Sequence, residues 1–134
     1  MDGAIQRWEV ATSADPSYGR AHFKLGALYE ERGDMDRAAA SYEAVGPSHA
    51  EHAEANYRLG KIHGNRGDLD GAIASYRISI AGDASKANVH CKLGCALYRQ
   101  GDTHAAIAAF EAALLADPSH RRARVNLRRT INIM

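Results

Sequence analysis

Three basic side chains, Lys24, Arg58 and Lys92, recur at an interval of 34 residues in this chain of 134. The fourth place at this interval holds Asn126. Ammonium and guanidinium groups at one repeated position can form charge-assisted hydrogen bonds to the carboxylates of another molecule. The pattern therefore predicts a basic ladder that binds an acidic partner. The alternative is that the three bases are simply solvated, since Lys and Arg are common on any exposed helix face.

A second group of reactive side chains is His90, Cys91 and Cys95. The two cysteines share one helical face, but a closed zinc site usually needs four ligands and only two soft ones converge here. A disulfide within one helical turn matches disulfide geometry poorly, and the chain has no third cysteine. No obvious base stands beside the cysteines to activate a thiol. We therefore expect no metal site and no catalytic thiol.

The common catalytic motifs are absent from the sequence, which contains no P-loop, no dinucleotide-binding glycine fingerprint and no nucleophile elbow. Gly-Asp pairs recur at 33–34, 67–68 and 101–102. A catalytic role for these aspartates would require three active sites, so we interpret the pairs as turns. The sequence predicts a protein that is not an enzyme and that uses no cofactor.

Composition narrows the class of protein. Apolar residues make up 46% of the chain, enough for a folded domain with its own core. No apolar run approaches the roughly 18 residues of a membrane span, so we expect no membrane contact. The start, Met1-Asp2-Gly3, lacks the basic region of a secretory signal. With its two cysteines one helical turn apart, the chain is expected in a reducing, intracellular setting, the cytoplasm.

The net charge of +1 conceals an asymmetry between the two parts of the chain. Residues 1–56 include ten acidic and five basic residues, whereas residues 57–134 include six acidic and twelve basic ones. This gradient either steers an acidic partner or reflects the solvated flank of a last helix rich in arginine. The near-neutral total falls short of the usual basic footprint, so nucleic-acid binding is not expected.

The elements that hold these residues repeat every 34 residues. Leu-Gly pairs begin at residues 25, 59 and 93, and Gly-Asp pairs begin at residues 33, 67 and 101. Small residues follow at 38, 72 and 106, and aromatic residues at 42, 76 and 110. Each unit reads as two helices with one apolar stripe each, joined at Gly-Asp. On these motifs the chain resembles the tetratricopeptide repeat family over nearly its whole length.

The resemblance implies a single all-α domain, a right-handed α-solenoid of antiparallel helix pairs with about eight helices. The expected order is a half unit at 2–14, full units at 19–52, 53–86 and 87–120, and a half unit at 121–134. We expect each Gly-Asp pair to end one helix and cap the next. Asp15 and Asp117 are expected to cap helices that begin at the following proline, and Ser48 with Glu51 to form a capping box.

In the family, the first helices of successive units line a concave groove. Carried over position by position, this resemblance implies a mildly basic groove with aromatic anchors, suited to a peptide or helix of a partner with acidic character. The groove residues expected on this basis are Arg20, Phe23, Lys24, Tyr57, Arg58, Lys61, Lys92, Tyr98 and Arg122.

One sub-family binds the tails of heat-shock chaperones through a clamp of Lys, Asn and Arg side chains. The corresponding positions here hold other residue types, namely Phe23, Ala27, Arg58, Asn88 and Lys92. A shift by one unit matches no better. The clamp is therefore absent, and we do not expect chaperone tails to bind.

An array that starts and stops in mid-repeat predicts either a fragment of a longer protein, which we favour, or a small protein that uses half units as caps. Terminal repeats normally have a polar outer face, but the residues expected at the two ends are apolar: Ile5, Trp8, Leu127 and Ile131. Exposed apolar ends favour association between copies. The alternative function is thus a structural or self-assembling spacer that associates through its terminal helices.

Overall fold

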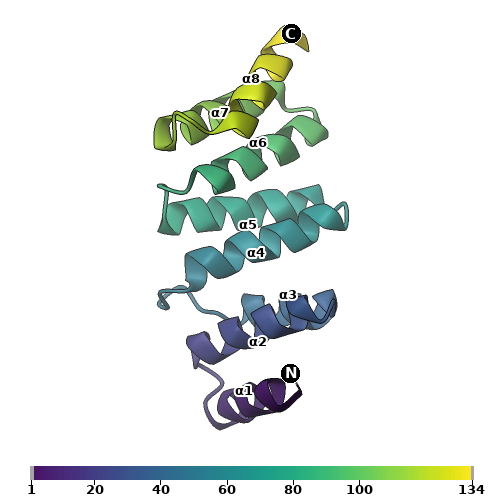
Figure 1. Ribbon diagram of the computed structural model, residues 1–134, viewed down its shortest axis with the longest axis vertical. Coiled ribbons are helices and arrows are strands. Elements are labelled where there is room, and N and C mark those ends of the chain that lie inside the picture. The colour runs from purple at the N-terminus through teal and green to yellow at the C-terminus, as the bar shows by residue number, and fades with distance from the viewer. Residues whose placement is uncertain (1, 134) are drawn as a thin grey trace.

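The computed structural model describes residues 2–133, and within that range the chain forms eight α-helices and no strand. The helices stack along one axis from the N-terminus to the C-terminus (Figure 1). None of the helices in these residues is long and apolar enough to cross a membrane. The helices are α1 (Asp2–Ala14), α2 (Gly19–Glu31), α3 (Met35–Glu43), α4 (His52–Asn65), α5 (Leu69–Gly82), α6 (Ala87–Gln100), α7 (Thr103–Ala116) and α8 (Arg121–Ile133).

Three antiparallel pairs, α2 with α3, α4 with α5 and α6 with α7, form the repeated units. Each pair turns at a glycine with positive φ, a conformation that favours glycine because it has no Cβ: Gly33, Gly67 and Gly101, with φ of 80°, 82° and 91°. The aspartate that follows caps the second helix by accepting a backbone N–H at 3.3, 2.9 and 3.1 Å in the three units. The expected Gly-Asp turns are confirmed.

The expected caps of the first helices are wrong. Asp15 and Asp117 accept hydrogen bonds from the backbone and hydroxyl groups of Ser17 and Ser119 instead, so each closes a turn before its helix begins. The predicted capping box at Ser48 is also absent, because α4 begins at His52 and has no side-chain cap. Local turn formation thus competes with capping at these junctions.

The core repeats with the sequence. The leucines at positions 25, 59 and 93 are all buried. Each Leu is followed by a glycine on which the aromatic ring of the second helix packs. A Cβ built on Gly26, Gly60 or Gly94 would lie 2.5–2.6 Å from a ring atom of Tyr42, Tyr76 or Phe110. The glycine is therefore required for close approach of the two helices.

Neighbouring units are also linked by polar contacts that repeat. Asp36 accepts a hydrogen bond from Arg66 at 2.6 Å, and the equivalent Asp70 accepts one from Gln100. These contacts join the start of one second helix to the end of the next first helix. Together with the packing of α4 on α6 and of α6 on α8, they set the phase at which the first helices follow one another.

The two end helices differ from the expectation in one respect. Ile5 is only 5% exposed and belongs to the core cluster around Leu25 and Tyr42, so its expected place on an exposed end face is wrong. The reason is that α1 packs on α2 and turns Ile5 inward. Trp8 is half-buried against the same cluster, and Leu127 is half-buried against the C-terminal one.

Candidate functional site

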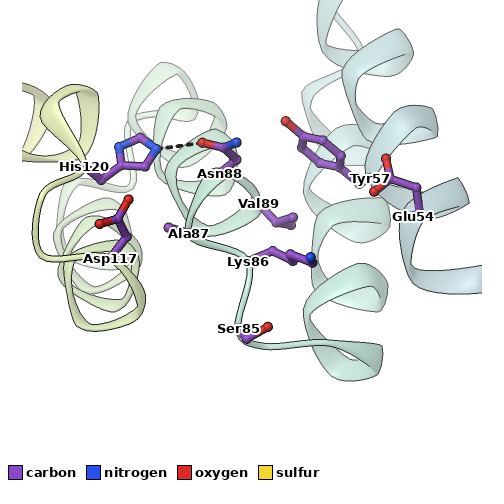
Figure 2. Close-up of a pocket in the computed structure, with 9 residues that line it drawn as sticks. All are labelled: Glu54, Tyr57, Ser85, Lys86, Ala87, Asn88, Val89, Asp117 and His120. Carbon is purple, nitrogen blue, oxygen red and sulfur yellow. Dashed lines mark hydrogen bonds between the residues drawn. The ribbon is translucent and has the colours of Figure 1, made fainter.

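A cavity of 440 Å³ lies between the starts of α4 and α6. Figure 2 shows Glu54 and Tyr57 on the α4 side of the cavity and Asn88 with His120 on the other side. Lys86, the residue before α6, extends toward the space between them. The cavity therefore combines an aromatic wall with hydrogen-bond donors and acceptors, and with both a positively charged and a negatively charged side chain.

His120 is held in one tautomer by its two hydrogen bonds. Its Nδ1 accepts the backbone N–H of Ala123 at 3.1 Å, so this nitrogen carries no proton. Its Nε2 then donates to Asn88 Oδ1 at 2.7 Å (Figure 2). His120 thus caps the last helix and fixes the Asn88 amide, which leaves the amide nitrogen of Asn88 available to a ligand.

Two further cavities continue this surface along α6. One, of 190 Å³, lies between α4 and α6 and contains Lys61, Tyr76 and Lys92. The other, of 200 Å³, lies between α6 and α8 and contains Tyr98, Asn126 and Arg129. The two share Cys95 and Arg99, so they adjoin. We call the three cavities together the groove.

The groove changes in charge along its length. Carboxylates of Glu54 and Asp117 line the first cavity, but among residues 2–133 no carboxylate lines the second or the third. Four bases line these two cavities, and none of them forms an ion pair in the part of the chain that the structure describes: Lys61, Lys92, Arg99 and Arg129. The second and third cavities therefore form a positively charged surface with aromatic edges.

Arg58, the middle residue of the predicted basic ladder, is neutralised within the chain. Its guanidinium lies 3.1 Å from Glu54 and 3.7 Å from Glu30. It also stacks over the ring of Phe23 at 5.4 Å, and that ring packs against Tyr42 with centroids 5.8 Å apart. Both Arg58 and Phe23 are therefore engaged with their own neighbours rather than presented to a partner.

The other predicted basic groove residues on α2 lie away from the three cavities. Arg20 and Lys24 are exposed on α2, and neither lines the groove. The structure thus brings the predicted groove residues together only from α4 onward. There Tyr57 lines the first cavity, Lys61 and Lys92 the second, and Tyr98 the third.

Tyr57 is built into the wall of the groove. Its ring packs on Tyr76 with centroids 6.2 Å apart, and the ammonium group of Lys61 lies 4.7 Å from its centroid. Burial raises the pKa of the Tyr57 hydroxyl, so the group stays a neutral donor. Arg122 is exposed on α8, and its charge acts on both Tyr57 and Cys95.

Several groove residues escaped the sequence analysis. Arg99 and Arg129 bring two bases to the groove, and His120 fixes Asn88, although none of the three belongs to the recurring ladder. Arg129 occupies the same repeat position as Lys61, so the spacing of the repeat does place it on the predicted groove face, although it was not among the groove residues expected. His120 occupies the same repeat position as His52, but this spacing does not show that its side chain reaches Asn88. At the position of Arg99 no other base recurs.

Comparison with known proteins agrees with this architecture. A family model described as "Tetratricopeptide repeat" matches residues 2–48 and 91–127. A second model, described as "TPR repeat", matches residues 60–101. The search of curated proteins returned no match.

Among solved structures, the chain is similar to MamA, with 27% identity and a TM-score of 0.87 over 98% of this chain and 77% of the other. It is also similar to YrrB, described as a TPR protein with an unusual peptide-binding site, with 20% identity and a TM-score of 0.85 over 98% and 68% of the chains. A third is the first TPR of Spaghetti (RPAP3), bound to the HSP90 peptide SRMEEVD, with 16% identity and a TM-score of 0.77 over 86% and 91%.

The helix pairs, the glycine-aromatic packing and the 34-residue phase thus agree with the family models, of which the first alone matches more than half of the chain. The expected all-α solenoid is confirmed. This chain belongs to the tetratricopeptide repeat family.

Proposed function

We propose that this chain is a non-enzymatic interaction scaffold whose groove binds a carboxylate-rich peptide segment of a partner protein. One observation supports this proposal above the others. Lys61, Lys92, Arg99 and Arg129 line two adjoining cavities in which no carboxylate of the described residues compensates them. Bases without a carboxylate partner at a cavity wall favour an anionic ligand.

The shape of the groove is consistent with a peptide. Its cavities follow α6 in sequence and alternate aromatic edges, Tyr57 and Tyr98, with the bases. A segment that alternates apolar and acidic side chains could place its apolar groups on the tyrosines and its carboxylates on the bases. The peptide-binding site described for YrrB and the peptide bound to the first TPR of Spaghetti (RPAP3) support the view that the fold accommodates peptides.

The test is a binding titration with a fluorescein-labelled peptide in which glutamates alternate with leucines. A second peptide with glutamine in place of each glutamate serves as the neutral ligand. We expect the acidic peptide to bind and its affinity to fall with added salt, because half-exposed charges are screened. The neutral peptide should bind more weakly by at least about tenfold, the equivalent of one charge-assisted contact.

A pair of variants locates the site. The double change Lys61→Glu with Lys92→Glu should lower affinity for the acidic peptide by at least about tenfold. The matched control is Arg7→Glu with Arg77→Glu, which makes the same change of charge at exposed positions of α1 and α5. Equal losses in both variants would show that only net charge matters, and this would overturn the proposed groove.

A second function, self-association, is favoured by one observation on α8. Ile131 is 50% exposed and, with Leu127, lines a shallow hollow of 270 Å³ on this helix. Arg124 and Arg128 flank the hollow, so two copies of α8 would repel each other. The acidic first part and basic second part of the chain favour a head-to-tail contact of α8 with another copy's α1.

Light scattering across a concentration series tests this second function. The expected result is a mass that rises with concentration and returns to that of a monomer in Ile131→Glu, which changes an exposed side chain and leaves the core intact. Trp8→Glu should act in the same way from the other end. A monomer at every concentration would exclude self-association and leave the groove proposal intact.

A further inference from the structure

Cys95 lies where the second and third cavities of the groove meet, and its side chain is half-buried. It is one of two free cysteines in the chain, and the other, Cys91, lies one turn earlier on α6. Only Cys95 lines the groove. A reagent in the groove would therefore meet the Cys95 sulfur and not that of Cys91.

A donor from the last helix holds the Cys95 sulfur. The Asn126 amide of α8 donates to Cys95 Sγ at 3.4 Å. This bond is stronger when the acceptor is a thiolate, because a charged acceptor binds donors more tightly than a neutral one. The donor from α8 arises only because α6 and α8 pack together.

The charges that face Cys95 come from every helix packed against it. Lys92 and Arg99 lie on α6 itself, Lys61 faces the same cavity from α4, and the neutral hydroxyl of Tyr76 comes from α5. Arg122 and Arg129 come from α8, while α7 contributes only the ring of Phe110. In the part of the chain that the structure describes, no carboxylate lines either cavity. Such an electropositive and partly open site is typical of reactive cysteines.

The two cysteines therefore differ in protonation. The hydrogen bond from Cys91 lowers the pKa of Cys95, and the charges of Lys92, Arg122 and Arg99 lower it further against the effect of burial. The hydrogen bond to Cys95 raises the pKa of Cys91, which is only 2% exposed, and burial adds to this effect. These opposite directions, together with the burial of Cys91, favour Cys95 over Cys91 as the thiolate of the pair.

We propose that Cys95 is a modification site that takes small disulfides bearing carboxylates, with the bases of the groove binding the carboxylates. The Cys95 thiolate attacks one sulfur of the reagent, a new S–S bond forms, and the S–S bond of the reagent breaks. Its other sulfur leaves with the electron pair as a thiolate and is protonated by solvent. Cys95 is oxidised to a mixed disulfide while half of the reagent is reduced to a thiol.

The adduct should persist rather than pass to an internal disulfide. Release by Cys91 requires its thiolate, and Cys91 is the protonated member of the pair. The bound group would then carry its carboxylates next to Lys92 and Arg99. It would then block the site proposed for the acidic peptide. This consequence rests on the proposed function, but the reactivity of Cys95 is independent of it.

The experiment compares two chromogenic disulfides, the dianionic 5,5′-dithiobis(2-nitrobenzoate) and the uncharged 4,4′-dithiodipyridine. In the folded chain at pH 7 we expect one thiol to react with the dianion about tenfold faster than a free cysteine does, since an ordinary thiol is only a few per cent thiolate at this pH. Cys95→Ala should abolish this fast phase. The change is conservative, because the same repeat position in the first unit holds alanine, Ala27.

Two further variants separate the causes. Cys91→Ala should leave the reactive thiol but move the pH midpoint of its rate upward, because one donor is lost. Lys92→Gln should slow the dianion more than the uncharged reagent. A reaction that survives in Cys95→Ala, a Cys95 rate equal to that of free cysteine, or the same ratio of the two reagents in Lys92→Gln would each overturn the proposal.

Oxidised glutathione, whose carboxylates flank its disulfide, tests the product directly by mass spectrometry of the intact chain. The expected result is a single glutathione adduct that is absent in Cys95→Ala. A chain lighter by two hydrogens would mean that Cys91 displaces the adduct, and this would overturn the proposed persistence. Binding of the acidic peptide is then measured on the chain that carries the adduct. The mass of the adduct tests the reactivity of Cys95 without any peptide, so a failure of the groove proposal would appear only in the peptide measurement.

Discussion

Arg58 and Lys92 occupy the same position in consecutive units, yet their surroundings are opposite. Arg58 is paired with Glu54, four residues earlier, and with Glu30, 28 residues earlier. The residues at these two distances from Lys92 are Asn88 and Gly64, and neither carries a charge. The middle residue of the predicted ladder is therefore neutralised, whereas Lys92 in the next unit is not.

Two residues after Arg58 and Lys92, the buried glycines have the same surroundings in both units. Gly60 and Gly94 follow the leucines of the two units, and each lies under an aromatic ring at almost the same distance. The repeat therefore constrains what is buried, because every unit must fit the same neighbour. It does not constrain exposed side chains, whose partners vary from unit to unit. This difference is what turns a repeated fold into one particular binding surface.

The largest expected effect is a loss of stability when the buried glycine-aromatic contact is disrupted. Gly60→Ala places a methyl group 2.5 Å from a ring atom of Tyr76, so the ring must move. We expect a loss of about 1–3 kcal/mol in the free energy of unfolding, and a similar loss for Gly94→Ala. Urea unfolding followed by circular dichroism measures both losses.

The matched control for this prediction lies one turn further along α4. A Cβ on Gly64 would meet its nearest atom at 3.8 Å, an ordinary contact. Gly64→Ala should therefore stabilise the chain by up to about 1 kcal/mol, the difference in helix propensity. Equal effects at Gly60 and Gly64 would contradict the packing argument.

The next effect concerns the two bases themselves. Lys92→Gln should weaken binding of the acidic peptide about threefold to tenfold, since it removes a base without a partner from the groove. Arg58→Gln should leave affinity nearly unchanged but lower stability by roughly 0.5 kcal/mol, because Glu54 and Glu30 lose their partner. Fluorescence anisotropy and urea unfolding give the two values, and the reverse order of affinities would remove the distinction between the two positions.

A third change introduces at Lys92 the ion pair that Arg58 has. Gly64→Glu places a carboxylate at the position that Glu30 holds relative to Arg58. A Cβ at Gly64 meets its nearest atom at an ordinary 3.8 Å, and Gly64 lines the second cavity, so Lys92 should become paired. Gly64→Gln fills the same space without the charge, and the acidic peptide should bind Gly64→Glu about threefold more weakly than Gly64→Gln.

The smallest expected effect is the converse change. Glu30→Gln with Glu54→Gln releases Arg58 while the amide oxygen at position 30 can still accept the Tyr42 hydroxyl, which now donates to Glu30 at 2.7 Å. We expect the acidic peptide to bind about twofold to threefold more tightly, with the gain lost at high salt. An unchanged affinity would mean that α2 and the start of α4 lie outside the binding surface.

Much of the fold followed from spacing alone. The Leu-Gly pairs, the Gly-Asp turns and the aromatic residues recur at 34 residues, and each has a local physical role that does not depend on the rest of the chain. The helix caps were harder to predict. Asp15 and Asp117 close turns with the serines that follow them, because a nearby hydroxyl competes with the helix N-terminus for the same carboxylate.

The candidate site was predictable only in part. Tyr57, Lys61, Lys92 and Tyr98, which the phase of the repeat assigned to the groove, line three successive cavities, and their role in binding stays a prediction. It could not show that Phe23 is covered by Arg58, or that Ile5 turns into the core. The expected cytoplasmic location and the division into units remain predictions.

By itself, the sequence determined the helix pairs, their turns and the residues each pair buries, because these depend on contacts within about one repeat. Only the tertiary structure decided which charges remain free. Glu30 reaches Arg58 from the preceding unit, and Asn126 reaches Cys95 from the following one. Long polar side chains take whichever partner the neighbouring unit places within hydrogen-bond distance, and that depends on how successive units stack.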